Sequence, residues 1–278
     1  MGTSHVTGAV KYTGFNSNKG PSPALWGRLQ HVSDPNDRYE FFTDFLQFGG
    51  SVSTNVGEYI GEGGRWVSYE DTGGSIAQLA SEVGGAVRIT TDTTDNDECW
   101  MMPGGTASVF GKISDTAGED KLLIFEARVR FGVVTSGNAF VGLSEEGLAA
   151  ADTITDAGAL ASKDFIGFCV LEADPDALMF VYRKAGQAMV TKIASVQALT
   201  ASTWYKVGFV FDPTFPEDKR IKVFVDGSEN ATYVTATNIA TATFPDGEEL
   251  HVLLGVKNST TVAQPLDVDW VKVSQVRA

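Results

Sequence analysis

The chain has 278 residues, of which 43% are hydrophobic, and its formal net charge is −14 at pH 7. A surface of that charge repels nucleic-acid phosphates and anionic lipid headgroups, so we expect neither nucleic acid nor membrane as a partner. The length suits one large all-β domain or two small domains.

Residues 1–40 show no regular spacing of apolar side chains. The stretch is rich in Gly, Pro, Asn and Ser, and it begins without the basic and apolar regions of an export signal. It is either a free N-terminal tail or an extended arm that anchors on another protein. We favour the arm, because isolated apolar side chains are unfavourable in water. The partner-binding candidates are then Tyr12, Phe15, Leu25 and Trp26.

From residue 41 onward the pattern indicates one β-sandwich. In the stretch LLIFEARVRFGV, Phe125 and Val129 fall on one face and Glu126 and Arg128 on the other, which is typical of a half-buried strand. DFIGFCVLE and ALMFVYRKAG flank a polar turn and predict a hairpin. Further strands are predicted at WYKVGFVFD, RIKVFVDGS, ELHVLLGVK and LDVDWVKVSQV, and the expected core includes Phe125, Val129, Phe131, Phe209, Phe211, Val223 and Val225. With no convincing long helix, these strands favour a sandwich over βαβ units.

Two groups of carboxylates are candidates for a catalytic pair. Glu145 and Glu146 are adjacent, so on a strand they point to opposite faces and cannot flank one glycosidic bond. Glu172, Asp174 and Asp176 have the alternate spacing, but Pro175 lies among them and the chain must turn back there. A solvated hairpin tip is the better interpretation. We therefore expect no catalytic residue in this chain.

The sequence gives only weak indications of a metal site or of aromatic side chains that stack on a sugar. The acidic stretch 92–98 is either a surface turn, which is the simpler interpretation, or a calcium loop. His251 lies in an apolar strand and is interpreted as a structural histidine with satisfied hydrogen bonds. Cys99 and Cys169 are expected to be reduced and buried. No cofactor and no metal site are expected.

The tryptophans have two interpretations. They either stack on a sugar or, as is commoner in sandwiches, fill the core; the residues are Trp66, Trp100, Trp204 and Trp270.

Several strands resemble one known fold. FEARVRF, AFVGLSEEG, WYKVGFVFDP, IKVFVDG and DWVKVSQVR resemble the concanavalin A-like lectin/glucanase jelly roll, shared by laminin G-like modules and family 16-type glucanases. The resemblance covers residues 41–278 and implies an all-β, concanavalin A-like jelly-roll β-sandwich with residues 1–40 as an extended N-terminal arm. The acid motif of the glucanases, Glu-x-Asp-x-x-Glu, is missing here, which implies that the protein is not an enzyme.

A narrower resemblance is to virion proteins of tailed bacteriophages. It rests on the segments GPSPALW, FFTDFL and GGAVRITTDTTDNDE, which occur in that order before the jelly roll. The resemblance implies a capsid decoration (cement) protein that is assembled in the host cytoplasm and binds the major capsid protein and other virion subunits. A homo-oligomer is expected, and a trimer would suit the local axes of a capsid. The alternative is a carbohydrate-binding adhesin on a head or tail appendage, with host glycan as its ligand and with exposed aromatic residues and a calcium site on its concave face or at its loop ends.

Overall fold

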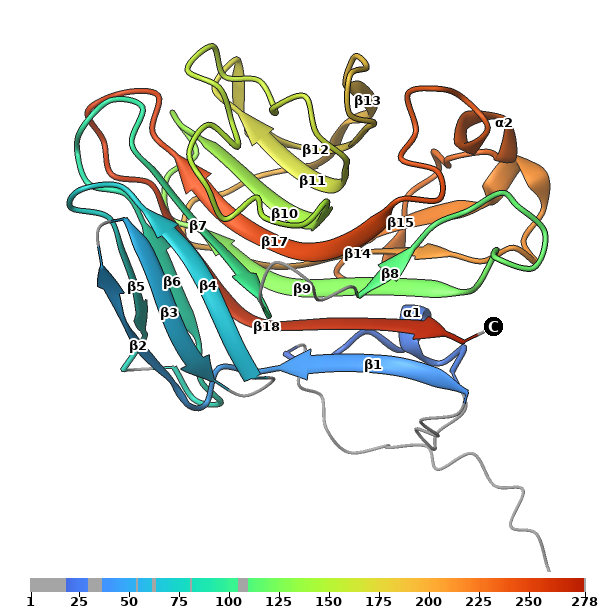
Figure 1. Ribbon diagram of the computed structural model, residues 1–278, viewed down its shortest axis with the longest axis horizontal. Helices are drawn as coiled ribbons and strands as arrows, with labels where there is room; N and C mark the ends of the chain where they lie inside the picture. The colour runs from blue at the N-terminus through green and yellow to red at the C-terminus, as the bar shows by residue number, and fades with distance from the viewer. Residues whose placement is uncertain are drawn as a thin grey trace, which may run out of the picture.

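The computed structural model describes residues 19–29, 37–53, 55–61, 64–80, 82–104 and 110–277. Within these residues the chain forms two antiparallel β-sheets that stack face to face (Figure 1). Each sheet turns an apolar face toward the other, so that the two share one core. The predicted all-β sandwich is confirmed.

Sheet A has eight strands and sheet B has ten, counted over the described part of the chain. In spatial order, sheet A contains β16 (Ser228–Glu229), β15 (Ile221–Val225), β14 (Trp204–Phe211), β9 (Leu123–Phe131), β18 (Pro265–Val276), β6 (Val87–Thr90) and β5 (Ser75–Gln78), and β1 (Arg38–Thr43) pairs with the far end of β18. Sheet B contains β13 (Val190–Ala198), β12 (Asp174–Arg183), β11 (Phe165–Leu171), β10 (Asn138–Ser144), β17 (Glu249–Lys257), β7 (Glu98–Pro103), β4 (Gly64–Glu70), β3 (Val56–Gly61) and β2 (Phe48–Ser53), and β8 (Gly111–Lys112) pairs with β17. The helical turns are α1 (Pro23–Trp26), the 3₁₀ turn η1 (Glu217–Lys219) and α2 (Ala236–Ile239).

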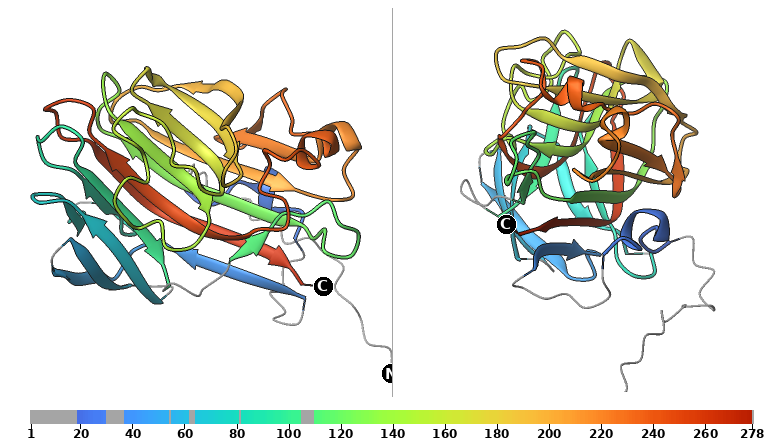
Figure 2. Two further views of the ribbon diagram at one scale, coloured as in Figure 1. Left: turned by 45° about the horizontal axis from the view of Figure 1, so that its top comes forward. Right: turned by 90° about the vertical axis from the view of Figure 1, so that its right-hand side faces the viewer.

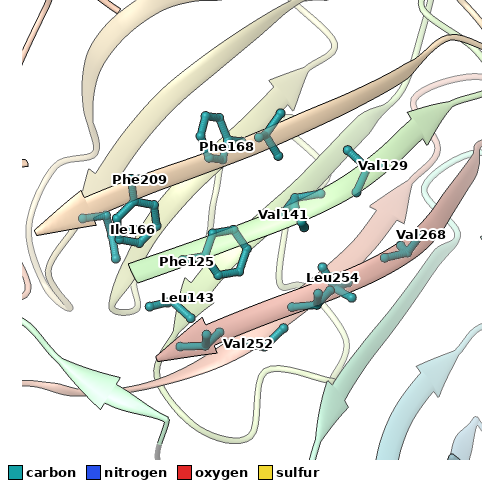
Figure 3. Packing of buried hydrophobic residues seen from close by; sticks show 14 of the residues in the cluster. Phe125, Val129, Val141, Leu143, Ile166, Phe168, Phe209, Val252, Leu254 and Val268 are labelled. Carbon is teal, nitrogen blue, oxygen red and sulfur yellow. The ribbon is translucent and has the colours of Figure 1, made fainter. Parts of the chain in front are cut away.

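The core lies between the inner faces of the two sheets. Phe125 and Val129 of β9 and Phe209 of β14 point into this space, where residues of β10, β11 and β17 meet them (Figure 3). The Phe125 and Phe209 rings stack with their centroids 5.4 Å apart. Large aromatic side chains from both sheets thus fill the interior, which is how stacked sheets are held together.

The predicted strand alternation is confirmed for the core positions. Phe125, Val129, Phe131, Phe209, Phe211 and Val223 are all buried, and Val225 is partly buried. On the opposite face of β9 the expectation of a half-buried strand was wrong, because Glu126 and Arg128 are buried as well. Residues of the N-terminal region and of neighbouring strands cover them.

Shortening a core ring tests this arrangement. We expect Phe209→Ala to lower the free energy of unfolding by ~3–5 kcal/mol, because it leaves a cavity between the sheets. The measurement is a urea denaturation curve, with Val83→Ala as the control. Val83 is 88% exposed, so its substitution should change stability by less than ~0.5 kcal/mol. Equal effects of the two substitutions would contradict the assignment of Phe209 to the core.

Candidate functional site

The first candidate surface is the outer face of sheet A, where residues 19–29 lie. We call these residues the N-terminal segment. It forms the short helix α1, which begins with Pro23 at its first position, where proline's fixed φ is favourable. Leu25 is fully buried against Ile124, Val210 and Phe224, which belong to β9, β14 and β15.

A glycine in β14 makes room for Leu25. A Cβ atom at position 208 would lie 2.7 Å from Cδ2 of Leu25 and 2.7 Å from the carbonyl oxygen of Phe125. Only glycine lets the segment approach the sheet this closely without displacing atoms. Gly208 therefore belongs to the seat of the N-terminal segment.

Polar contacts fix the segment on the sheet. A Glu126 carboxylate oxygen accepts hydrogen bonds from the Ser22 backbone N–H at 2.9 Å and from Trp26 Nε1 at 2.6 Å. Burial raises the pKa of Glu126, while these hydrogen bonds and nearby Lys206 act in the opposite direction. The Lys272 ammonium lies 4.3 Å from the centre of the Trp26 ring, a cation–π contact. These contacts hold the segment to its own chain.

The structure locates two of the four predicted partner-binding residues. Leu25 has its side chain buried against its own sheet, and Trp26 is partly buried beside Glu126 and Lys272. Tyr12 and Phe15 lie outside the described residues. The boundary near residue 40 and the role of these residues in binding a partner stay predictions, but residues 19–29 pack on the sandwich rather than apart from it.

The second candidate surface is the outer face of sheet B, which lies on the inside of the curve of the sandwich (Figure 1). The loop between β10 and β11, residues 145–164, covers this face. Its side chains Leu148, Ile154 and Leu160 join a cluster with residues of β7, β10, β11, β12 and β17. This loop and α1 lie on opposite sides of the sandwich (Figures 1 and 2). The loop thus covers the part of this face that is formed by the central strands, whereas Val56 and Ile60 of β3 stay exposed.

Two charged side chains lie beneath this loop. Glu98 of β7 and Lys257 of β17 are 2% and 1% exposed. Glu98 accepts hydrogen bonds from Trp100 Nε1 at 2.7 Å and from the backbone N–H of Asp152, while Lys257 donates to Asp156 Oδ1 at 2.8 Å. Burial raises the pKa of Glu98. The two groups therefore tie the loop to the sheet and are not accessible to a substrate.

The carboxylates considered for catalysis do not converge. One Glu145 carboxylate oxygen is 2.7 Å from Lys163 Nζ and the other accepts the Asp164 backbone N–H, whereas Glu146 is exposed. Glu172, Asp174 and Asp176 are exposed around the turn between β11 and β12. The predicted hairpin tip is confirmed. Arranged like this, the five carboxylates offer no pair that faces a common cleft.

The tryptophans mostly fill the interior. Trp66, Trp100 and Trp270 are buried. Trp204 is partly exposed, and its ring lies 4.4 Å from the guanidinium carbon of Arg128 and 4.5 Å from that of Arg130. The adhesin alternative predicts exposed aromatic residues on the concave face or at the loop ends. On the concave face, Trp100 is covered by the loop 145–164.

The acidic stretch 92–98 forms a turn in which the Asp92 and Asp97 carboxylates lie close to each other. Asp92 accepts hydrogen bonds from the backbone and side chain of Thr94, and Glu98 turns away beneath the loop 145–164. Partial burial and the neighbouring Asp92 carboxylate raise the pKa of Asp97 to about 7. Over the residues that the structure describes, no three acidic, His or Cys side chains are placed to hold one metal ion.

Histidine and cysteine predictions had different outcomes. His251 is fully buried, but in the described structure neither ring nitrogen has a hydrogen-bond partner, so the expectation of a satisfied histidine was wrong. Burial lowers its pKa, which keeps the ring neutral at pH 7. Cys99 and Cys169 are free and buried, as predicted. They belong to different clusters, on the inner and outer faces of sheet B.

Comparison with known proteins supports the fold. No protein-family model matches the chain, and a search of curated proteins found no match. A protein of unknown function from Shewanella oneidensis MR-1 is similar in structure, with a TM-score of 0.54 and 16% identity over 89% of this chain and 92% of that one. The carbohydrate recognition domain of Emp47p has a TM-score of 0.49 and 14% identity over 87% and 98% of the two chains. A β-glucanase from Bacillus licheniformis has a TM-score of 0.46 and 14% identity over 86% and 98%.

At 16% identity the likeness to the Shewanella protein shows the fold alone. The two antiparallel sheets confirm the predicted all-β sandwich. No described helix is long and apolar enough to cross a membrane. The site chemistry has to be argued from this chain's own residues.

The seat of the N-terminal segment predicts a stability effect. We expect Leu25→Ala to lower the free energy of unfolding by ~2–5 kcal/mol, because its side chain fills a closed apolar pocket. Urea denaturation measures this change, and Ala24→Ser, at the exposed neighbouring position, should alter stability by less than ~0.5 kcal/mol. If Leu25→Ala leaves the curve unchanged, the segment is not seated on sheet A in solution.

The acidic turn predicts a pH effect. The pKa of Asp97 is about 7 in the folded protein and about 3.9 when unfolded, so the folded state binds the proton more tightly, and the contribution of Asp97 to stability is lost as pH rises from about 4 through about 7. We expect Asp97→Asn to raise the melting temperature at pH 8, and this advantage to shrink as pH falls below about 7 and to vanish near pH 4. Asp95→Asn, at an exposed position in the same turn, is the matched control.

Calcium discriminates between the two interpretations of this turn. For a surface turn, millimolar calcium leaves the melting temperature of the wild type unchanged at pH 8. A rise that Asp97→Asn abolishes would instead establish the calcium loop, because a bound cation would stabilise the ionised carboxylates.

Proposed function

We propose that this protein is a non-enzymatic structural component of a bacteriophage virion, a capsid decoration protein that binds the shell through residues N-terminal to its sandwich. The observation that carries the proposal is the covered centre of the concave face. The loop 145–164 fills it, and the charged groups beneath, Glu98 and Lys257, are committed to holding that loop. A glycosidase of this fold class would need an open cleft with convergent carboxylates.

The position of Lys19 supports attachment from the other side of the molecule. The Lys19 carbonyl accepts a hydrogen bond from Trp270 Nε1 on the outer face of sheet A. Lys19 therefore lies at that face, and Tyr12 and Phe15 precede it in the sequence. On a shell of repeated subunits, weak contacts made by each such arm add up through multivalency, particularly if the protein is a trimer.

The carbohydrate-binding adhesin remains the second candidate. It no longer draws support from the concave face, because the aromatic residue there is covered. Exposed aromatic side chains elsewhere, such as Tyr39 at one end of the sandwich, support this second candidate.

Two truncations separate attachment from folding. We expect deletion of residues 2–18 to leave the melting temperature unchanged, because the seat of residues 19–29 is intact, and to abolish binding to capsids stripped of the native protein. Deletion of residues 2–29 should in addition lower the melting temperature, because it exposes Ile124, Val210 and Phe224.

The measurement is co-sedimentation of each purified variant with the stripped capsids. A matched control is the full chain with Ala24→Ser, which should bind as the wild type does. Wild-type occupancy by the variant that lacks residues 2–18 would contradict attachment through the arm.

A further inference from the structure

A pocket of about 460 Å³ opens where β1, β8 and the end of β18 meet. Tyr39 and Phe110 form an aromatic wall, with ring centroids 5.7 Å apart, and Tyr39 is 37% exposed. Neither the N-terminal segment nor the loop 145–164 lines it. The pocket is therefore a third surface, separate from both outer faces of the sandwich.

The walls of the pocket are fixed by contacts to the rest of the fold. The Gln275 side-chain amide bridges β18 and β8, because its oxygen accepts the Lys112 backbone N–H at 3.0 Å and its nitrogen donates to the Lys112 carbonyl at 2.6 Å. Phe110 also packs against the core residue Phe41, with ring centroids 4.7 Å apart. A site whose walls are already held in place loses little conformational entropy when a ligand binds.

The charge of the pocket is opposite to that of the whole chain. Lys112, Lys121 and Arg277 line it with one carboxylate, Glu119. Lys112 Nζ is 2.7 Å from a Glu119 carboxylate oxygen. In the described part of the chain, Lys121 and Arg277 have no ion-pair partner. On a protein with a net charge of −14, two unpaired cations beside an aromatic wall favour an anionic ligand at this place.

We propose that this pocket binds a carboxylate-bearing sugar, such as a uronic acid unit of an acidic glycan. Arg277 and Lys121 pair with the carboxylate, and the guanidinium offers two parallel donors. The apolar C–H face of the sugar ring stacks on Tyr39, whose ring is partly exposed. The Tyr39 hydroxyl and the Glu119 carboxylate are available for sugar hydroxyls, and the pocket volume lies in the range of small-ligand sites. The inference does not depend on capsid attachment.

Calorimetric titration of the full chain tests the site, with sodium glucuronate, glucose and sodium acetate as probes. We expect glucuronate to bind with one site per chain. Glucose lacks the carboxylate and acetate lacks the sugar ring, so each should bind at least about tenfold more weakly. Tyr39→Ala and Arg277→Gln should each weaken glucuronate binding about tenfold. Arg277 is exposed, so Arg277→Gln should leave folding unchanged. This variant therefore tests the site even if Tyr39→Ala perturbs folding.

Matched controls lie outside the pocket. Phe42→Ala removes an exposed aromatic ring from the same strand as Tyr39, and Arg65→Gln removes an exposed cation from β4. Neither should change glucuronate binding. Absence of glucuronate binding, equal binding of glucose or of acetate, or binding unaffected by both pocket variants would each overturn the proposal.

Discussion

The fold depends on the fact that its central strands are apolar on both faces. In β10, Val141 points into the core between the sheets while Phe140 lies in the outer cluster, and in β17 Leu254 and Leu253 are divided in the same way. A two-layer sandwich buries only one face of each sheet. The remaining apolar area, at ~25 cal/mol per Å², favours a further cover on each side. The loop 145–164 supplies it for sheet B and residues 19–29 supply it for sheet A.

Buried charged groups position both covers. Glu98 and Lys257 hold the loop 145–164 through Asp152 and Asp156, and Glu126 holds the N-terminal segment. Apolar contacts alone would allow a cover to slide, since they have no direction. A buried carboxylate that accepts two specific donors fixes one position, and leaving it without a donor is costly. The polar groups thus specify where each cover lies, while the apolar groups provide most of the driving force.

The strands and the inner core could be predicted from the sequence because a period of two is a local signal. The stretches AFVGL and FIGFCVL are apolar without alternation, which is typical of a strand buried on both faces. The seat of the N-terminal segment could not be found in this way, since Ser22 and Glu126 are 104 residues apart and residues 19–29 have no periodicity. One signal was available in the sequence, Gly208 inside a strong strand pattern, whereas the alternation of β9 assigned Glu126 to the solvent face. The end pocket depends on three distant segments, and no pattern in any one of them indicates it.

Because the central strands of both sheets are covered on their outer sides, the surfaces left for partners are restricted. The cover on sheet B is the loop that connects β10 to β11, so it cannot leave the sheet without disturbing that connection. The cover on sheet A is made from the chain before β1, and Lys19 is the first described residue that contacts the sandwich. Segments near chain ends can extend toward another protein without disturbing a folded core. This asymmetry favours the N-terminal side for attachment to a large assembly and leaves the end of the sandwich, with Tyr39 and Arg277, for a small ligand. The two proposals therefore use different parts of the molecule and can both hold for one chain.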